Sequence, residues 1–343
     1  MRKKEEETRP EATAQTIKDG LSRLGKTANG IKQTYLDLKV EGTLLADASL
    51  IAKYVNLQSV DVQRNEITDL SALSALRHLT HLDASHNKLT QVVPLDPPTR
   101  NLRSLHLAHN NIIHIADISA YQRLSKLVLD GNQITDLSGL GSLPHLKALS
   151  VQDNRLATLE GLQKCSGLRR LSLSRNELTS LEPLHSMSHI ESLEVAGNKL
   201  SSLKGVESIT CLARLDCSDN LITELEEIRY AQPLDLLKEL TVTGNAIVNF
   251  KLSRVHIVHL IPQLEVLNGE GVSFTEKVKA GNLHGADAEP LKTIRRKYFP
   301  NGELDDGGGA VIPVSAGLLA SNGLDAKDDE IFFEAADEAV RTL

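Results

Sequence analysis

Residues 124–143, LSKLVLDGNQITDLSGLGSL, contain the pattern that recurs through most of the chain. The fixed residue of this pattern is Asn132, and asparagines recur on both sides of it at intervals of 22 or 23 residues, with a final interval of 25. These asparagines are Asn65, Asn87, Asn110, Asn132, Asn154, Asn176, Asn198, Asn220 and Asn245. Apolar residues surround each of them at constant offsets, which in this segment are occupied by Leu124, Leu127, Leu129, Ile134 and Leu137.

A repeat of this length and composition is typical of a leucine-rich repeat array. One repeat cannot bury its own apolar face, so neighbouring repeats must stack, each with a short strand, a tight turn and a return segment. The asparagine amide is suited to the turn because it satisfies backbone groups that would otherwise be buried without partners. We therefore predict an α/β solenoid of 22-residue repeats, with about ten parallel strands on its concave face and a cap at each end.

The composition agrees with a solenoid. Of the 343 residues, 41% are hydrophobic but only 3% are aromatic, and tryptophan is absent, so the core must consist mostly of leucine, isoleucine and valine. The three cysteines, Cys165, Cys211 and Cys217, have neither a disulfide pattern nor metal-ligand spacing. The sequence contains no long apolar stretch, no signal-like N-terminus and no Asn-x-Ser/Thr acceptor, from which we expect a soluble intracellular protein without a membrane segment.

The repeats divide the chain into five parts. We predict a disordered N-terminus, an N-terminal cap, the repeats, a C-terminal cap, and an acidic, glycine-containing tail that is mostly irregular, over residues 1–14, 15–34, 35–250, 251–272 and 273–343. In the N-terminal cap, Ile17, Leu21 and Leu24 indicate a short helix that covers the first repeat. Thr43 takes the place of the asparagine in an edge repeat.

The tail carries most of the net charge. The chain has a net charge of −7, and residues 302–343 hold ten acidic residues against Lys327 and Arg341. The rest of the chain is close to neutral, which disfavours nucleic-acid binding through a basic field and favours an interaction tail. A short docking helix is predicted over 328–341, and the candidate docking residues of the tail are Tyr298, Phe299, Phe332 and Phe333.

Two segments depart from the repeat. Residues 93–99, VPLDPPT, add one residue and three prolines, and residues 226–237 suggest a longer helix on the convex side. Both are interpreted as loop variation.

One motif near the N-terminus suggests nucleotide binding. Residues 20–27, GLSRLGKT, match the phosphate-binding pattern GxxxxGK[ST] completely. A nucleotide loop follows a buried strand and opens a helix, whereas the residues before Gly20 are polar and helix-like. Gly25 is better interpreted as the end of a helix. Nucleotide binding remains a remote alternative.

The candidate interaction site is the concave face. The residues between the strand leucines form one predicted row, Asp61, Asp83, His106, Val128, Ser150, Ser172, Glu194, Asp216 and Thr241. From this face we select as partner-binding residues Asp61, Asp83, His106, Lys126, Arg170, Glu194, Arg214 and Asp216. Asp61, Asp83 and His106 are the only cluster that resembles an acid–base or metal site, but on an open sheet such residues favour polar recognition. We expect no catalytic residue, cofactor or metal, and Ser150→Ala on this open face should be nearly neutral.

The N-terminal run narrows the protein class. Residues 20–40, GLSRLGKTANGIKQTYLDLKV, resemble the leucine-rich-repeat protein of ciliary radial spokes, at Gly20, Leu21, Lys26, Thr27, Asn29, Gly30, Tyr35 and Leu38. The end of the array, residues 261–269, IPQLEVLNG, resembles the C-terminal cap of intracellular leucine-rich-repeat proteins. The likeness covers about residues 15–270 and does not extend to the tail.

The resemblance implies a function. It implies a non-catalytic scaffold in the axoneme, within a hetero-oligomeric complex, that binds radial spoke components and supports ciliary or flagellar motility. The alternative is a regulatory subunit of a phosphatase, a class that usually presents acidic and aromatic residues on the concave face. The aromatic residues are missing from the predicted row.

Overall fold

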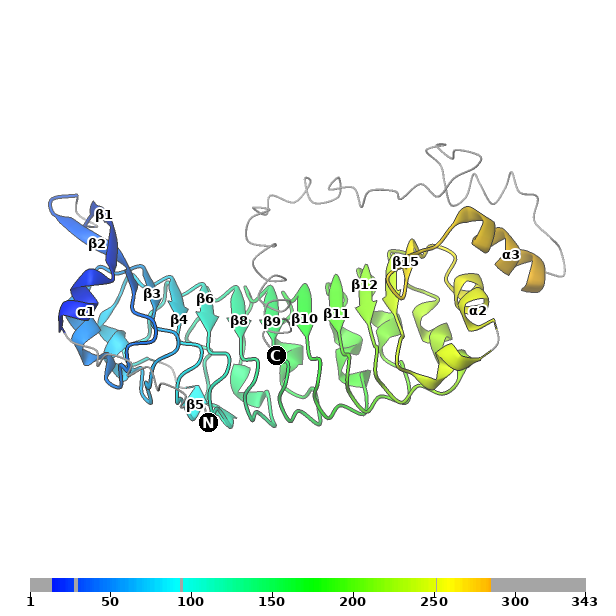
Figure 1. Ribbon diagram of the computed structural model, residues 1–343, viewed down its shortest axis with the longest axis horizontal. Coiled ribbons are helices and arrows are strands. Elements are labelled where there is room, and N and C mark those ends of the chain that lie inside the picture. The colour runs from blue at the N-terminus through cyan, green and yellow to red at the C-terminus, as the bar shows by residue number, and fades with distance from the viewer. Residues whose placement is uncertain (1–13, 28–29, 93–94, 251, 285–343) are drawn as a thin grey trace, which may run out of the picture. The chain divides into compact units, whose positions relative to one another are not determined.

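The computed structural model describes residues 14–27, 30–92, 95–250 and 252–284 (Figure 1). All of them belong to Met1–Tyr298, the first of the two compact units of the chain. The predicted docking residues Tyr298, Phe299, Phe332 and Phe333, and the predicted helix over 328–341, lie outside the described residues. The expectations for the acidic tail therefore stay predictions.

A single sheet of 13 strands runs through the described residues, with its strands in sequence order (Figure 1). All neighbouring strands pair in parallel except the first pair and the last pair, which are antiparallel. The strands are β1 (Leu21–Lys26), β2 (Gln33–Lys39), β3 (Ser59–Asp61), β4 (His81–Asp83), β6 (Ser104–His106), β8 (Lys126–Val128), β9 (Ala148–Ser150), β10 (Arg170–Ser172), β11 (Ser192–Glu194), β12 (Arg214–Asp216), β13 (Glu239–Thr241), β14 (Val266–Leu267) and β15 (Glu270–Gly271). The predicted repeat solenoid is confirmed.

The return segments form 3-10 helices of three to seven residues, because a 22-residue repeat leaves too little chain for a longer helix once the strand and turns are made. Within the described ranges they are η1 (Ala48–Lys53), η2 (Ser71–Ala75), η3 (Ser138–Leu140), η4 (Leu162–Lys164), η5 (Glu182–Ser186), η6 (Val206–Ser208), η7 (Leu225–Ala231) and η8 (Ala246–Asn249). The longer helix predicted over 226–237 corresponds to η7, which is the longest of them but ends at Ala231.

The proline-containing repeat has no 3-10 helix in its described part. There β5 (Gln91–Val92) pairs in parallel with β7 (His114–Ile115) of the next repeat and forms a second, two-stranded sheet. Pro97 and Pro98 follow β5, and proline lacks the N–H that a helix interior requires. Extended segments replace the 3-10 helix in the described part of this repeat and in the next, which contains β7 and likewise has no 3-10 helix among its described residues.

The asparagines form the predicted internal ladder, and each connects its own turn to the preceding repeat. The Asn132 side chain is only 8% exposed. Its Oδ1 accepts the Ile112 N–H at 3.1 Å, and its Nδ2 donates to the carbonyl oxygens of Leu129 at 2.8 Å and Leu107 at 3.1 Å. The same contacts recur at Asn65, where Oδ1 accepts the Thr43 N–H at 2.9 Å. The amide therefore satisfies backbone groups in two consecutive repeats.

The N-terminal cap differs from the predicted helix. α1 (Ala14–Asp19) is short, and Ile17 is its buried residue. The chain then enters β1, which forms a hairpin with β2, and Leu24 in β1 is 61% exposed. The prediction that Leu21 and Leu24 extend a capping helix, and that Gly25 ends one, was wrong, because Gly25 lies within β1 opposite Thr34. A period-3.6 pattern and a short alternating strand cannot be distinguished over so few residues.

The C-terminal end of the array continues past the predicted boundary at residue 272. α2 (Ser253–Leu260) is followed by β14, β15 and then α3 (Phe274–His284), which packs against α2 and buries Ala280. Arg254 of α2 joins the two helices, since its Nε donates to Glu276 at 2.7 Å and its Nη1 to the Leu267 carbonyl at 3.0 Å. The helix α3 was not predicted. No helix within the described ranges is long and apolar enough to cross a membrane.

Candidate interaction surface

The open face of the sheet carries two rows of side chains. The predicted row is confirmed in register, because each of its members pairs with the corresponding residue of the next strand; it is called here the central row and consists of Asp61, Asp83, His106, Val128, Ser150, Ser172, Glu194, Asp216 and Thr241. The residues two positions earlier form the leading row, Ser59, His81, Ser104, Lys126, Ala148, Arg170, Ser192, Arg214 and Glu239. Both rows lie on one face of the sheet, because side chains two residues apart on a strand point to the same side.

The N-terminal part of the central row is acidic and contains a histidine. The Asp83 Oδ2 lies 3.6 Å from the His106 Nδ1, and Asp83 also accepts the Ser85 N–H at 2.9 Å. Burial acts to raise the pKa of Asp83, but the hydrogen bonds from His106 and Ser85 outweigh it and leave the pKa lowered. Asp61, one strand earlier, lies 3.5 Å from the Lys39 Nζ. Both acids therefore have a polar side chain of the neighbouring strand beside them.

The middle of the open face has a floor of small, covered side chains. Ala148 is 1% exposed, and Ser150 and Ser172 are each 2% exposed. The Ser150 Oγ donates to the Asp130 Oδ1 at 2.6 Å, and the Gln152 N–H donates to the same oxygen at 2.8 Å. Burial raises the pKa of Asp130 despite these hydrogen bonds. Ser150 is thus a buried donor to the partly covered Asp130 carboxyl. This contradicts the premise that Ser150 lies on an open surface, while the effect of Ser150→Ala on stability stays a prediction.

Two acids, Glu194 and Asp216, lie on neighbouring strands in the C-terminal part of the central row. The Ser172 Oγ donates to the Glu194 Oε2 at 2.6 Å, and Asp216 occupies the next strand. Burial raises the pKa of Glu194, and the nearby charge of Asp216 raises it further. Asp216 in turn accepts the Ser218 Oγ at 2.7 Å.

Cations accompany these acids in the leading row. Lys126 and Arg170 lie two strands apart with Ala148 between them, and Arg214 follows two strands later. The Arg214 Nε lies 3.8 Å from a carboxylate oxygen of Glu239. The predicted partner-binding residues therefore share one face but do not form a single cluster. Asp83 lies beside His106 and Glu194 beside Asp216, while the cations form a separate line.

Two groups of residues were missed by the sequence reasoning, which considered only positions between strand leucines. The first is Asp130, the single charged residue two positions before a ladder asparagine, where the others are Gln63, Ser85, Ala108, Gln152, Ser174, Ala196, Ser218 and Thr243. That exception in an otherwise uncharged column was the signal that could have identified it.

The second missed group immediately precedes the ladder asparagines. These residues all have positive φ, between 51° and 71°, and are Arg64, His86, His109, Gly131, Asp153, Arg175, Gly197, Asp219 and Gly244. The rings of His86 and His109 stack with centroids 4.4 Å apart. The Arg175 Nη2 donates to the Asp153 Oδ2 at 2.6 Å. The glycines at this position were a visible sign of a left-handed turn.

Within the described ranges, no group of three or more His, Cys, Asp or Glu side chains could hold a metal ion. Burial raises the pKa of the Cys165 thiol, and burial also raises that of Cys217 far above its ordinary range, so neither forms a thiolate nucleophile readily.

The GxxxxGK[ST] segment has the opposite context from a nucleotide loop. A helix, α1, precedes it, and Gly25 and Lys26 lie inside the hairpin strand β1. A Cβ on Gly20 would lie 2.2 Å from the Lys39 carbonyl oxygen, and one on Gly25 would lie 2.3 Å from the Leu36 side chain. Close packing against β2 therefore accounts for both glycines without a phosphate.

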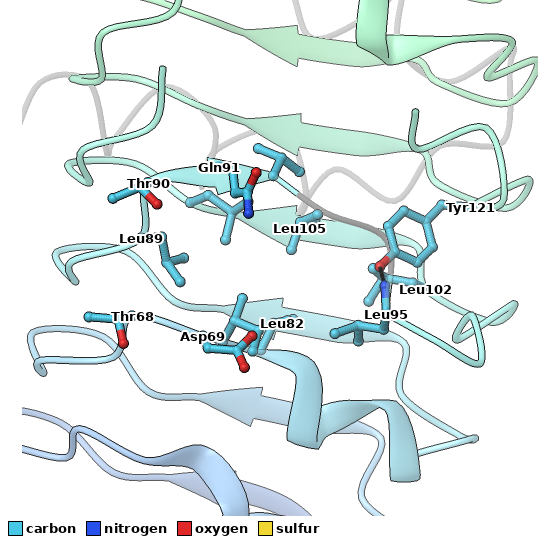
Figure 2. Close-up of a pocket in the computed structure, with 13 residues that line it drawn as sticks. Thr68, Asp69, Leu82, Leu89, Thr90, Gln91, Leu95, Leu102, Leu105 and Tyr121 are labelled. Atoms are coloured by element: carbon cyan, nitrogen blue, oxygen red, sulfur yellow. Dashed lines mark hydrogen bonds between the residues drawn. The ribbon is translucent and has the colours of Figure 1, made fainter. Parts of the chain in front are cut away.

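An interior cavity of about 130 Å³ lies beside the proline-containing repeat (Figure 2). Leu82, Leu102 and Leu105 line it, together with Tyr121, whose hydroxyl accepts the Leu95 N–H at 2.8 Å. Its lining is mainly aliphatic, and Tyr121 is already hydrogen-bonded to the backbone. The cavity is a packing gap where the 3-10 helix is missing and is separate from the open face.

Comparisons with known proteins agree with this architecture. Models of leucine-rich repeats match residues 55–97 and 100–113, and a model of the leucine-rich repeat domain of endo-beta-N-acetylglucosaminidase EndoS matches residues 114–220. Leucine-rich repeat-containing protein 23 of Homo sapiens is 38% identical over 128 residues, which cover 37% of this chain and 36% of that protein. Geranylgeranyl transferase type-2 subunit alpha of Homo sapiens is 30% identical over 127 residues, 36% of this chain and 22% of that protein.

A solved structure shows the same fold. An internalin from Listeria monocytogenes superposes with a TM-score of 0.59 at 22% identity, over 69% of this chain and 67% of that one. The asparagine ladder, the in-register parallel strands and these matches identify the chain as a leucine-rich repeat protein. Similarity to Leucine-rich repeat-containing protein 23 spans little more than a third of that relative's length. Arrays of this kind generally bind other proteins through extended surfaces.

Proposed function

We propose that this protein is a non-catalytic scaffold of the axonemal radial spoke, which binds other spoke components through the open face of its sheet. The observation that carries the proposal is the N-terminal run, in which Gly20, Leu21, Lys26, Tyr35 and Leu38 resemble the radial spoke leucine-rich-repeat protein. These residues belong to the β1–β2 hairpin and the turn before it. The 38% identity to Leucine-rich repeat-containing protein 23 supports a related repeat array.

The open face supports a binding role. It extends over nine consecutive strands, β3 to β13 without β5 and β7, with acids in both halves of its central row and cations in its leading row. Such a face offers many polar contacts and few of the Trp and Tyr anchors that dominate compact interfaces, although it does offer Arg170 and Arg214. Affinity then comes from a long contact area, as expected for a component that assembles with several neighbours.

The proposed organisation assigns separate roles to the parts of the chain. The open face binds one spoke component, and residues 285–343 bind another, with Tyr298, Phe299, Phe332 and Phe333 as docking residues. The high acid content of 302–343 supports ordering on a partner surface, since such a segment has too little apolar content to fold alone.

The test is localisation followed by axoneme fractionation. Tagged protein should be found along the cilium or flagellum and should stay with the axoneme after detergent extraction, and its loss should impair beating while cilium length is kept. A protein that stays in the cytosol and co-purifies with a phosphatase catalytic subunit would support the regulatory-subunit alternative instead. Micromolar ATP or GTP affinity that is lost in Lys26→Ala would favour the nucleotide alternative.

A further inference from the structure

A second surface with a uniform charge lies where the chain enters the strands. Five consecutive entry segments, 77–81, 100–104, 122–126, 144–148 and 166–170, contain eight Lys or Arg residues, three His residues and no Asp or Glu. We call the Lys and Arg residues the basic edge; they are Arg77, Arg100, Arg103, Arg123, Lys126, Lys147, Arg169 and Arg170. Lys126 and Arg170 also belong to the leading row.

Backbone hydrogen bonds hold these segments side by side. The Ser125 N–H donates to the Arg103 carbonyl at 2.8 Å, the Lys147 N–H to Ser125 at 2.8 Å, and the Arg169 N–H to Lys147 at 2.9 Å. Arg103, Lys147 and Arg169 therefore lie in one continuous row. The Arg103 N–H donates to the Thr80 carbonyl at 2.8 Å, which joins the first segment, 77–81, to the second. The Arg123 Nη1 also donates to the Asn101 Oδ1 at 3.0 Å.

The middle of the basic edge holds exposed cations that no acid of the neighbouring repeats compensates. Elsewhere a cation is commonly matched by an acid one repeat away, as in Lys199–Glu177 at 2.7 Å and Lys204–Glu182 at 2.6 Å. Within the described ranges, the exposed Arg103 and Lys147 are in no ion pair. The pairing resumes only where the edge ends, at Arg169–Glu191, 2.6 Å. Arg103 and Lys147 lie among further cations of the same sign and are not compensated by an acid, so this patch suggests a ligand that supplies counter-charges.

We propose that the basic edge binds an extended acidic segment of a partner protein. Strands about 4.8 Å apart give the five segments a length of roughly 19 Å, which corresponds to about six residues of extended polypeptide at about 3.3 Å per residue. An Asp- or Glu-rich stretch of this length places several carboxylates within reach of the guanidinium and ammonium groups, and arginine can bind each carboxylate with two hydrogen bonds.

A nucleic acid fits the edge less well. Proteins that bind single strands stack bases on aromatic side chains, and the five segments contain no Phe, Tyr or Trp. The acids Asp83, Asp130 and Glu194 on the adjoining open face would repel a longer polyphosphate, and the chain as a whole carries a net charge of −7. The basic edge is short and has acids beside it, which favours a short acidic peptide over a nucleic acid.

The test uses the purified full chain and a fluorescein-labelled octaglutamate peptide, followed by fluorescence anisotropy. We expect octaglutamate to bind, octaglutamine of the same length not to bind, and the affinity to fall as salt is raised to roughly 0.15 M. The double variant Arg103→Glu/Lys147→Glu should weaken binding by about tenfold or more. Because the measurement needs only purified protein and a synthetic probe, its outcome does not depend on the axonemal role.

The matched control is Lys53→Glu/Lys164→Glu, which makes the same charge change at exposed residues of η1 and η4 and should change the affinity less than about twofold. The variant Arg103→Gln/Lys147→Gln removes the two charges without reversing them and should cause an intermediate loss of affinity. It tests the proposal if charge reversal disturbs folding. Equal effects of the edge and control variants, or equal binding of octaglutamine, would overturn the proposal. Tighter binding of an oligothymidylate than of octaglutamate would assign the edge to nucleic acid instead.

Discussion

At the residue scale, the ladder asparagines and the open-face serines show what single positions do in this array. The asparagines were predictable because a strict period and a buried turn leave few residue types that can satisfy the backbone there. The environment of Ser150 was not predictable in this way, because its hydroxyl donates to Asp130, which lies 20 residues earlier in the chain. A pattern of alternating residues predicts on which face of the sheet a side chain lies. It does not predict how much of that side chain the neighbouring residues cover.

The ladder can be tested with two adjacent asparagines. The Asn110 Oδ1 accepts the Leu89 N–H at 3.0 Å, and its Nδ2 donates to the Leu107 carbonyl at 3.0 Å, while Asn111 is exposed. Asn110→Leu should lower the free energy of unfolding by roughly 1–3 kcal/mol, because it leaves buried backbone groups without partners. Asn111→Leu, the same change at the next residue, should shift it by less than about 0.5 kcal/mol in urea titrations. Similar losses at both positions would refute the ladder.

The partly covered carboxyl of Asp130, with its raised pKa, predicts a pH dependence of stability. Its folded pKa is raised above the ordinary 3.8, so the stabilisation it provides is complete below that value and is lost as the pH rises through the raised pKa. Asp130→Asn keeps an oxygen that can accept from Ser150 and Gln152 but does not ionise. We expect the free energy of unfolding of the variant, relative to the parent, to increase as the pH rises from about 4 to about 8.

The control for this experiment is Asp117→Asn. The backbone N–H of Ser119 lowers the pKa of Asp117, so its stabilisation is present above the ordinary value and lost in acid. That variant should lose stability relative to the parent as the pH rises, which is the opposite sign. A flat difference for Asp130→Asn across the pH range would show that the carboxyl is not buried as described.

At the element scale, the central strands followed from the sequence and the ends did not. Each central strand pairs with a strand on both sides and recurs at the repeat period, so the same pattern is seen many times in the sequence. The hairpin β1–β2 and the helix α3 occur once, and α3 depends on contacts such as Arg254–Glu276 that join residues 22 apart. The 3-10 character of the return segments was also not predicted, since apolar spacing indicates burial but not the helix type.

The N-terminal cap can be tested with two aliphatic residues that the sequence treated alike. Ile17 is 1% exposed and Leu24 is 61% exposed. Ile17→Ala should lower the free energy of unfolding by about 2–4 kcal/mol, because it opens a cavity against the first repeat. Leu24→Ala should change it by less than about 0.5 kcal/mol. Comparable losses of unfolding free energy for the two variants, in thermal or urea unfolding, would contradict the exposed position of Leu24 and favour the capping helix that the sequence suggested.

At the scale of the whole molecule, stacking arranges residues far apart in sequence into long rows, and the proposed function depends on those rows. The sequence correctly gave the order of the central row, because the repeat period fixes which residues are neighbours. It did not give the contacts within the rows, such as Asp83 with His106, or the covered floor around Ser150. Those depend on side-chain size and burial, which periodicity does not encode.

The central claim is that this open face attaches the protein to its assembly. Its most direct test is axoneme incorporation of Asp61→Lys/Arg214→Glu, which exchanges an acid and a cation at opposite ends of the face and keeps the net charge. The control Glu160→Lys/Lys164→Glu makes the same exchange at exposed residues in and just before η4.

Each variant is first checked for the parental melting temperature, and detergent-extracted axonemes are then assayed for the tagged protein. The account predicts that the open-face variant is largely lost from axonemes while the control is retained. Equal retention of the two variants would contradict it.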